Sequence, residues 1–237
     1  PYLPPNEEAN PAMGWRAFRI GLDRPAMLRA QLRALLRAAA GRDLKVMFPF
    51  VSTVDEVKQA SRLLDMECER LEAAGYERPG KIERGVMLEV PATLYQIPAL
   101  AKLVDFVSIG SNDMLQYFFA VDRTNQRLAH RYDHLNPAFL KALYRLRQDC
   151  DAHELPISLC GEMASRPLEA IALMALGYRS LSISPFNVAS IKMLIRALDI
   201  GFVSSYLIPQ LDSADASLRP KLRAFARDHK LSLADEV

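Results

Sequence analysis

Cysteine, tryptophan and long apolar runs are scarce in this sequence of 237 residues. It holds three cysteines and one tryptophan. The cysteines are odd in number and lack the spacing of a metal site, which favours reduced thiols and a cytoplasmic location. No apolar stretch approaches the roughly 20 residues of a membrane span, and no signal peptide opens the chain. We therefore expect a cytoplasmic protein that does not enter the membrane.

An excess of charge of one sign is lacking as well. The 30 lysines and arginines balance 28 acidic residues, for a net charge of +2, and no polybasic run occurs. Nucleic acid is therefore not an expected partner. The chain also lacks an initiator methionine and opens with a proline-rich loop over residues 1–15, so we expect a piece of a longer protein.

Short apolar runs recur along the chain and predict buried strands over residues 45–50, 85–89, 104–109, 156–160 and 180–184. Helical patterns separate them. Pro25 suits a first helical position, Thr53 and Glu56 form a capping box, and Asn136 and Asn187 precede later helices. This alternation predicts an α/β protein whose parallel sheet is covered on both faces. Five such units fit either a doubly wound sheet or part of a (β/α)8 barrel.

One helix pattern carries an arginine row. Arg29, Arg33 and Arg37 recur every fourth residue beside the apolar face of the helix that begins at Pro25. Such rows are typical of a solvated helix face, and we expect one here.

Polar residues follow the predicted strands where functional groups collect in α/β proteins. Glu89 ends one strand, and Asn112 and Asp113 follow the next. Neighbouring strands lie about 4.8 Å apart, so Glu89 and Asp113 are expected to converge. Two carboxylates and an amide suit Mg²⁺ whose coordination is completed by substrate phosphate. The alternative is that each carboxylate caps a helix or pairs with an arginine.

Cys160 ends a further predicted strand, and Gly161 follows it at once. Cys68 and Cys150 lie within helix patterns and are typical of packing residues. Cys160 differs from them by its position, which predicts a thiol facing a pocket. Two arginines in loops, Arg16 and Arg123, could clamp phosphate or carboxylate, although each alone is more typical of a surface ion pair.

These residues lie in five motifs. They are Asn10-Pro-Ala-Met-Gly-Trp-Arg-Ala-Phe-Arg19, Val86-Met-Leu-Glu-Val-Pro-Ala92, Ser108-Ile-Gly-Ser-Asn-Asp113, Ala120-Val-Asp-Arg123 and Leu159-Cys-Gly-Glu-Met-Ala164. From residue 10 to about 198 the chain resembles the phosphoenolpyruvate-binding domain of enzyme I, the phosphoenolpyruvate–protein phosphotransferase of the bacterial phosphotransferase system. The wording of the motifs favours its nitrogen-related branch. Pyruvate phosphate dikinase and phosphoenolpyruvate synthase share the domain and are the alternative.

The resemblance implies a fold and a role for each residue. The fold would be a (β/α)8 barrel, incomplete here with about five of eight units, over residues 1–200, with a helical extension of the same domain over 201–237. Glu89 and Asp113 would hold Mg²⁺. Arg16, Asn112, Asp113 and Arg123 would form the phosphoenolpyruvate site. Cys160 would protonate the enolate as pyruvate forms, as a thiol rather than a thiolate.

The resemblance also implies partners. The full enzyme would pass phosphate to its own histidine and then to an HPr-like phosphocarrier protein, and it would dimerise through this domain. The phosphorylated histidine belongs to a missing domain, so His130, His134 and His153 are expected to be surface groups. Further phosphate-binding residues precede this chain in the family, so we expect the isolated chain to be inactive.

Two departures from the family pattern stand out. Ser111 replaces the usual Thr, and Ser165-Arg166 replaces Gly-Asp after the cysteine motif. Two other functions stay open. One is a non-catalytic module that senses phosphoenolpyruvate or mediates dimerisation, and the other is a metal-dependent lyase on the same barrel.

Overall fold

Four parallel strands lie side by side in sequence order, β1-β2-β3-β4. They are β1 (Leu44–Phe48), β2 (Ile82–Leu88), β3 (Phe106–Gly110) and β4 (Ile157–Cys160). The structure is a computed structural model that describes residues 8–128 and 131–233. A doubly wound sheet reverses its strand order at a switch point, and this sheet does not. The order is that of a segment of a (β/α)8 barrel.

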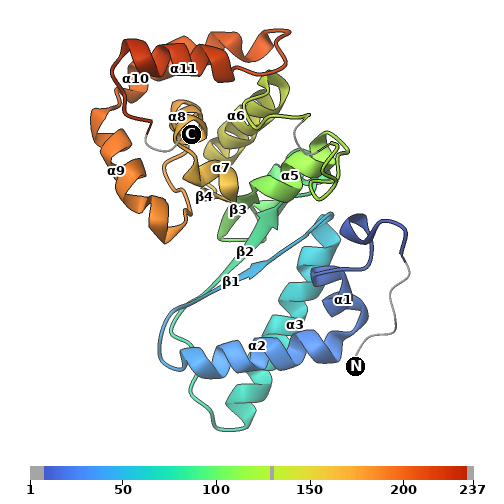
Figure 1. The fold of residues 1–237 in the computed structure, drawn as a ribbon. Coiled ribbons are helices and arrows are strands. Elements are labelled where there is room, and N and C mark those ends of the chain that lie inside the picture. Colours follow the sequence, from blue (N-terminus) through green and yellow to red (C-terminus); the bar gives the residue numbers. More distant parts are fainter. Residues whose placement is uncertain (1–7, 129–130, 234–237) are drawn as a thin grey trace.

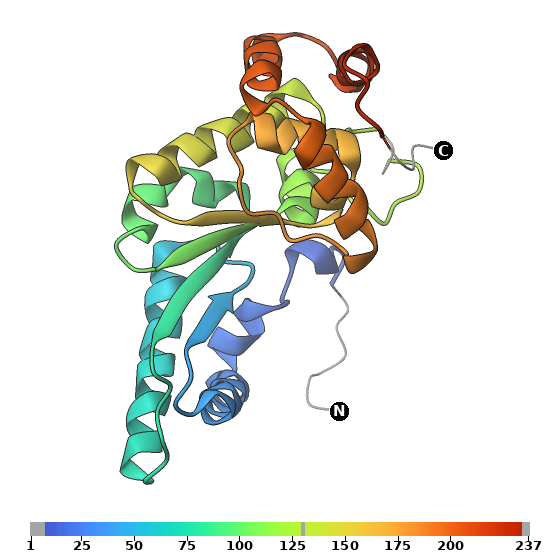
Figure 2. The same cartoon turned by 90° about the vertical axis from the view of Figure 1, so that its left-hand side faces the viewer.

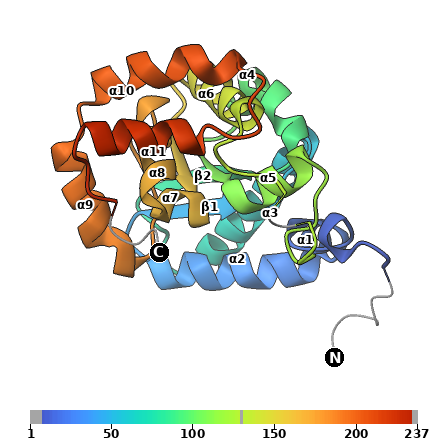
Figure 3. The same cartoon turned by 45° about the horizontal axis from the view of Figure 1, so that its top comes forward.

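Helices connect the strands and surround them (Figures 1 and 3). The α-helices are α1 (Phe18–Asp23), α2 (Pro25–Ala39), α3 (Val54–Ala73), α4 (Ile97–Leu100), α5 (Ser111–Phe118), α6 (Pro137–Ala152), α7 (Glu162–Ser165), α8 (Pro167–Ala175), α9 (Val188–Ala197), α10 (Ile200–Leu207) and α11 (Arg219–Asp228). Short 3₁₀ helices are η1 (Pro11–Met13), η2 (Pro91–Tyr95), η3 (Pro185–Asn187) and η4 (Ile208–Asp212). Figure 2 shows α3 running alongside the strands.

Local signals explain where several helices begin. The capping box at Thr53 is present, since its hydroxyl accepts from the Glu56 N–H and the Glu56 carboxylate accepts from the Thr53 N–H. Asn136 accepts from the Ala138 N–H at the start of α6. Asn187 differs from its prediction: its side chain makes no cap bond and donates instead to the Ser165 carbonyl at 3.0 Å.

The expectation of a fifth strand is wrong. Residues 180–184 contribute a single bridge, Leu181 to Leu159, rather than a strand. The segment runs parallel to β4 at this point, with two hydrogen bonds, and then enters η3 at Pro185. Pro185 has no N–H with which to extend the ladder. This chain therefore has four strands and one bridged segment of the barrel.

The first strand also departs from the expectation that both faces of the sheet are covered. In β1 the side chains of Lys45 and Met47 are exposed, while Val46 and Phe48 are buried. Strands β2 and β3 are buried more fully. One face of β1 is therefore open.

The arginine row on α2 is not the solvated face that the sequence predicts. Arg29 and Arg33 each donate through Nε to the buried Glu67 of α3, at 2.6 and 2.7 Å. Arg37 lies over the ring of Tyr76 at 4.7 Å. The row therefore joins α2 to α3 through a buried carboxylate and an aromatic ring.

The C-terminal helices pack on the β4 side of the molecule. Helix α10 packs on α8, and η4 packs on α6. Arg219 at the start of α11 binds Asp133 and Glu169, which lie in the loop before α6 and on α8. Within the described residues, no helix is long and apolar enough to cross a membrane.

Candidate active site

The predicted site residues gather at the carboxyl ends of the strands. The register pairs Leu88 with Ile109 and Gly110 with Cys160, so the ends of β2, β3 and β4 lie together. A methyl group added at Gly110 would lie 2.6 Å from Oε2 of Glu89. The carboxylate after β2 therefore lies directly against the end of β3, where only glycine leaves room for it.

Glu89 is buried and accepts a hydrogen bond from the Phe50 N–H at 2.7 Å. Burial raises the pKa of the Glu89 carboxyl, and the negative charge of Asp113 raises it further, against the opposing Phe50 N–H. A buried carboxyl beside a second one is a favourable position for a cation.

Asp113, in the first turn of α5, is buried between two guanidinium groups. Its Oδ2 lies 3.1 Å from Nη2 of Arg16, and its Oδ1 lies 3.4 Å from Nη2 of Arg123. Oδ1 has no hydrogen-bond partner among the described residues. The arginine pairing that the sequence left open as an alternative is thus present, and it brings both predicted anion-binding arginines to the carboxylates.

Phe50 forms a platform under two arginines. The guanidinium carbons of Arg16 and Arg19 lie 4.8 and 4.6 Å from its ring centroid. Arg16 also donates to the Tyr117 hydroxyl at 3.1 Å. The sequence reasoning missed Arg19, although it follows Arg16 by three positions on the same segment.

The backbone around these arginines is strained. Ala17, Phe50 and Ala120 have φ angles of 48°, 58° and 51°, in the left-handed region. They lie next to Arg16, under the arginine pair and in the loop that leads to Arg123. Such strain in non-glycine residues clusters at functional sites.

The metal ion predicted from the sequence would be held by two carboxylates at these strand ends, Glu89 and Asp113. No group of three or more His, Cys, Asp or Glu side chains suited to a metal occurs in the part of the chain that the structure describes. Mg²⁺ is commonly bound by one or two carboxylates, with waters and substrate phosphate completing the octahedron. Asp113 Oδ1, which accepts no hydrogen bond from the described residues, and the raised pKa of Glu89 fit such an ion.

Cys160 ends β4 with its thiol half-buried among the strand ends. Its S–H donates to the Ile109 carbonyl at 3.3 Å. Burial raises the pKa of the thiol, a hydrogen bond with Ser108 lowers it, and the charge of Glu89 raises it. Cys160 is therefore a thiol at neutral pH, which is the form that a proton donor needs.

Gly161 and Ser111 shape the turn after Cys160. Gly161 has a φ of 104°, and a methyl group there would lie 2.3 Å from Oγ of Ser111. That hydroxyl donates to the Cys160 carbonyl at 2.7 Å, so the serine that replaces the family's threonine keeps a hydroxyl bond. Asn112 accepts from the Glu162 N–H at 3.1 Å and joins α5 to α7.

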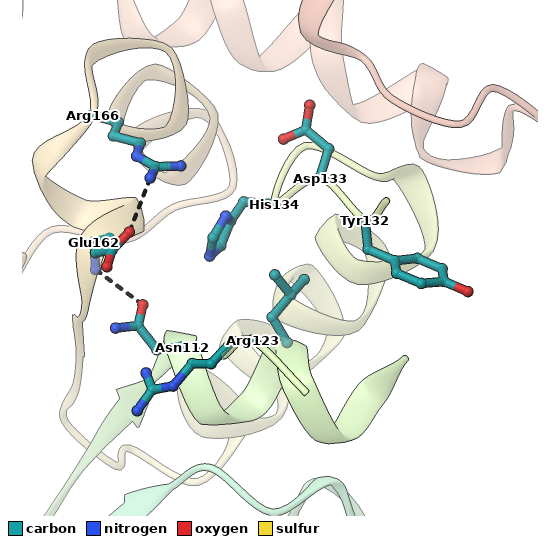
Figure 4. Close-up of a pocket in the computed structure, with 8 residues that line it drawn as sticks. Asn112, Arg123, Tyr132, Asp133, His134, Glu162 and Arg166 are labelled. Carbon is teal, nitrogen blue, oxygen red and sulfur yellow. Dashed lines mark hydrogen bonds and ion pairs between the residues drawn. The ribbon is translucent and has the colours of Figure 1, made fainter. Parts of the chain in front are cut away.

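The histidines differ from one another. His153 is exposed at the end of α6, as expected, and His130 lies outside the described residues. The expectation of a surface group is wrong for His134. Its ring is half-buried and points into the cavity shown in Figure 4, among Asn112, Arg123 and Glu162. The sequence around His134 does not indicate its burial, because the residues beside it in the cavity, such as Asn112 and Glu162, come from other elements.

The family model and the named relatives that match this chain all concern enzymes that use phosphoenolpyruvate (PEP). A family model described as the PEP-binding domain of PEP-utilising enzymes matches residues 1–200. An Escherichia coli (strain K12) protein named "Phosphoenolpyruvate-dependent phosphotransferase system" is 46% identical over 201 residues, covering 84% of this chain and 27% of the relative. A phosphoenolpyruvate-protein phosphotransferase of Staphylococcus carnosus (strain TM300) is 41% identical over 199 residues, covering 84% and 35%. This chain thus spans 27–35% of the length of these relatives.

A solved structure supports the fold. The structure of a citrate lyase from Burkholderia xenovorans LB400 is similar with a TM-score of 0.51 and 18% identity, over 87% of this chain and 71% of that chain. At this identity the likeness bears on the fold alone. Together with the parallel strand order, it confirms the expected α/β fold of the barrel type.

Proposed function

Because this chain belongs to the family of PEP-binding domains of PEP-utilising enzymes, we propose that it binds phosphoenolpyruvate within a phosphoenolpyruvate–protein phosphotransferase. The complete protein would move phosphate from phosphoenolpyruvate to a histidine of its own and then to an HPr-like phosphocarrier protein, with release of pyruvate. The names of the relatives favour this activity over that of a dikinase or synthase.

One observation carries the proposal: two carboxylates, two arginines and a protonated thiol meet at the same strand ends. Oδ2 of Asp113 lies 3.1 Å from Arg16 and its Oδ1 lies 3.4 Å from Arg123. The charge of Asp113 raises the pKa of Glu89, and the charge of Glu89 raises the pKa of Cys160. Phosphoryl transfer depends mainly on positioning and on neutralisation of charge. This site has groups for both tasks.

Each residue would have a definite task. Arg16, Asn112 and Arg123 would bind the phosphate and carboxylate oxygens, and Glu89 and Asp113 would hold Mg²⁺, which supplies charge neutralisation when bound. The phosphoryl group would form a bond to a nitrogen of the accepting histidine as its bond to the enol oxygen breaks, and the electron pair of the broken bond would stay on the enolate. The Cys160 S–H would then give its proton to the terminal enolate carbon to form pyruvate, and solvent would return a proton to the thiolate.

We extend the proposal to the setting of the protein. The complete protein would be a cytoplasmic homodimer of the nitrogen-related branch, with residues 1–200 as a partial barrel and 201–237 as its helical extension. Analytical ultracentrifugation would test the dimer. A carrier-phosphorylation assay with HPr-like proteins of the two branches would test the choice of branch.

The central experiment measures phosphoenolpyruvate-dependent phosphorylation and pyruvate release by the complete protein. Arg123→Gln should reduce turnover strongly, because it removes a phosphate-binding cation next to Asp113. Arg227→Gln is the matched control, since that arginine is exposed on α11 and pairs with its neighbour Asp228. Equal turnover of both variants would contradict the assigned site, and absence of any phosphoenolpyruvate-dependent reaction in the wild type would contradict the function.

A further inference from the structure

A cavity of about 540 Å³ opens beside two of the predicted substrate-binding residues. Asn112 and Arg123 line it from α5 and the loop that follows. The rest of its polar wall consists of Tyr132, Asp133, His134, Glu162 and Arg166 (Figure 4). The phosphoenolpyruvate site thus continues into a space whose other polar residues have no assigned role.

His134 is placed in this cavity with an unmatched polar atom. Its Nε2 is buried and has no hydrogen-bond partner among the described residues. Figure 4 shows the ring between Glu162 and Arg123, aimed into the cavity. Buried polar atoms are nearly always hydrogen-bonded, and a rotation of the imidazole ring would bring this atom to the open cavity, where a ligand oxygen would supply the missing partner.

The charges of the wall favour an anion as that partner. The acidic groups are neutralised: Glu162 pairs with Arg166 at 2.9 Å, and Arg219 binds both oxygens of Asp133 at 2.8 and 2.7 Å. Asn112 accepts from the Glu162 N–H, which leaves its NH₂ group as the donor. These pairs also balance the charges of Arg166 and Arg219, so the donors left for a ligand are the Asn112 NH₂ group and the guanidinium of Arg123, which lies 3.4 Å from Asp113.

His134 is a neutral donor in this setting. Burial lowers the pKa of its imidazole to about 4, and the positive charge of Arg166 lowers it further, against the opposing charges of Asp133 and Glu162. A neutral imidazole carries one hydrogen, and an anionic oxygen at Nε2 favours the tautomer with the hydrogen there.

The C-terminal segment holds this wall in place. The Leu218 N–H donates to the Leu135 carbonyl at 2.8 Å, and the Asn136 side chain donates to the Ala216 carbonyl at 3.0 Å. Together with the Arg219–Asp133 pair, these bonds fix the residues on both sides of His134. The segment lies beyond the residues 1–200 that the family model matches, so the support comes from outside the matched domain.

We propose that His134 donates a hydrogen bond through Nε2 to an anionic oxygen of the ligand that Asn112 and Arg123 bind, and that Arg219 is the residue that positions it. This inference rests on the proposed function. The alternative is that His134 has only a packing role, edge-on against Phe139, whose ring centroid lies 6.4 Å away.

Steady-state kinetics of the complete protein test the inference. His134→Phe keeps an aromatic ring for Phe139 but removes the donor, and it should raise the KM for phosphoenolpyruvate about tenfold, equal to about 1.4 kcal/mol, with kcat nearly unchanged. His134→Gln keeps an N–H donor and should restore most of the affinity. Arg219→Gln should shift KM in the same direction, and the double variant should be no worse than the larger single effect.

His153→Phe and Arg227→Gln are the controls, because both residues are exposed and the second lies on the same helix as Arg219. An unchanged KM in His134→Phe would overturn the inference, as would a loss in His134→Gln equal to that in His134→Phe. If the wild type turns over and Arg123→Gln is impaired while His134→Phe is normal, the inference alone fails. If the wild type shows no reaction with phosphoenolpyruvate, the proposed function fails and the inference falls with it.

A second measurement uses no variant, so misfolding of a variant cannot affect it. The ¹⁵N resonance of His134 Nε2 is followed in the wild-type complete protein during titration with phosphoenolpyruvate, inorganic phosphate and pyruvate. A shift with phosphate but not with pyruvate assigns the contact to the phosphoryl oxygens, and the reverse assigns it to the carboxylate. No shift at saturating phosphoenolpyruvate would overturn the contact.

Discussion

Glu89 and Cys160 have raised pKa values for the same physical reason, which is burial at the ends of neighbouring strands. The consequences for the two groups differ. A buried carboxyl gains from a cation, whereas a buried thiol keeps its proton at neutral pH and remains able to deliver it. Two different residues at this sheet edge therefore suit the two tasks: Glu89 suits cation binding, and Cys160 suits proton transfer.

Replacement of the thiol tests the proton-transfer task. Cys160→Ala in the complete protein should lower pyruvate release roughly 100-fold or more, within the range of general acids, and should leave Mg²⁺ binding intact. A lactate dehydrogenase-coupled assay measures pyruvate, and Mn²⁺ titration monitors the cation site. Cys68→Ala is the control, because that cysteine is buried on α3. Normal turnover by Cys160→Ala would refute the assigned role.

Replacement of the carboxylate tests the binding task. Glu89→Gln should weaken Mn²⁺ binding about tenfold or more, because it removes one of the two carboxylates that face the site. Electron paramagnetic resonance of Mn²⁺ measures the change directly and needs no turnover. Glu83→Gln is a suitable control, since that carboxylate lies on β2 and pairs with Lys45 and Lys81. Equal Mn²⁺ affinity in both variants would place the cation elsewhere.

Packing between elements depends on two arrangements described above, the α2–α3 ion pairs and the turn after β4. In the first, Arg29 and Arg33 hold the pKa of Glu67 below its ordinary value, although burial alone would raise it. The folded state thus binds this proton more weakly than the unfolded state does. The resulting stability is present above the ordinary Glu pKa and is lost as pH falls through the lower, folded value.

Glu67→Gln should therefore lower the free energy of unfolding by roughly 1–3 kcal/mol at pH 7. The difference from wild type should shrink as pH falls below about 4.3, the ordinary Glu pKa. Urea unfolding at a series of pH values measures both effects. Glu69→Gln, an exposed position on the same helix, should be nearly neutral throughout. A pH-independent difference for Glu67→Gln would show that the ion pairs are not its cause.

The turn after β4 depends on Gly161. Gly161→Ala combines a backbone conformation that is essentially confined to glycine, with φ 104° and ψ 179° and a cost of about 1–3 kcal/mol, with a clash against Ser111 Oγ at 2.3 Å. Gly75→Ala also has a positive φ, of 75°, with nothing within 4 Å of the added methyl group, so it reports the cost of a positive φ without a clash. Thermal unfolding should show a clearly larger loss for Gly161→Ala. Ser111→Ala in the same chain should recover part of the difference.

The whole chain is predictable from sequence where local chemistry decides the structure. The apolar runs identified all four strands, and the residues after them identified the place of the site. The strand predicted over residues 180–184 does not form, because only Leu181 has a bridge partner, Leu159. The sequence of a segment does not show whether a partner strand lies along its full length. Glu67 was missed because its partner Arg33 is 34 positions away. His134 was missed because the residues around it in the cavity, such as Asn112 and Glu162, come from other elements, and sequence spacing carries no signal for such contacts.

The size of the chain sets an expectation for its binding. It spans 27–35% of the length of its named relatives. The proposed function implies that further phosphate-binding groups belong to the part of the complete protein that this chain does not include. Isothermal titration of this chain with phosphoenolpyruvate and Mg²⁺ should therefore show weak binding or none, and the complete protein should bind more tightly. Equal affinities would show that this chain already holds every group that the ligand needs.

The hydrogen-bonding edge of β1 that faces away from β2 has a consequence for association between copies. β1 pairs with β2 alone in the described sheet, so one row of its backbone N–H and C=O groups is free to pair with a strand from another molecule. Lys45, with its charged and exposed side chain, stands in the middle of this edge and is the kind of residue that discourages such pairing. In the complete barrel that we propose, a neighbouring strand would take up these hydrogen bonds, so the isolated chain should self-associate through this edge more readily than the complete protein.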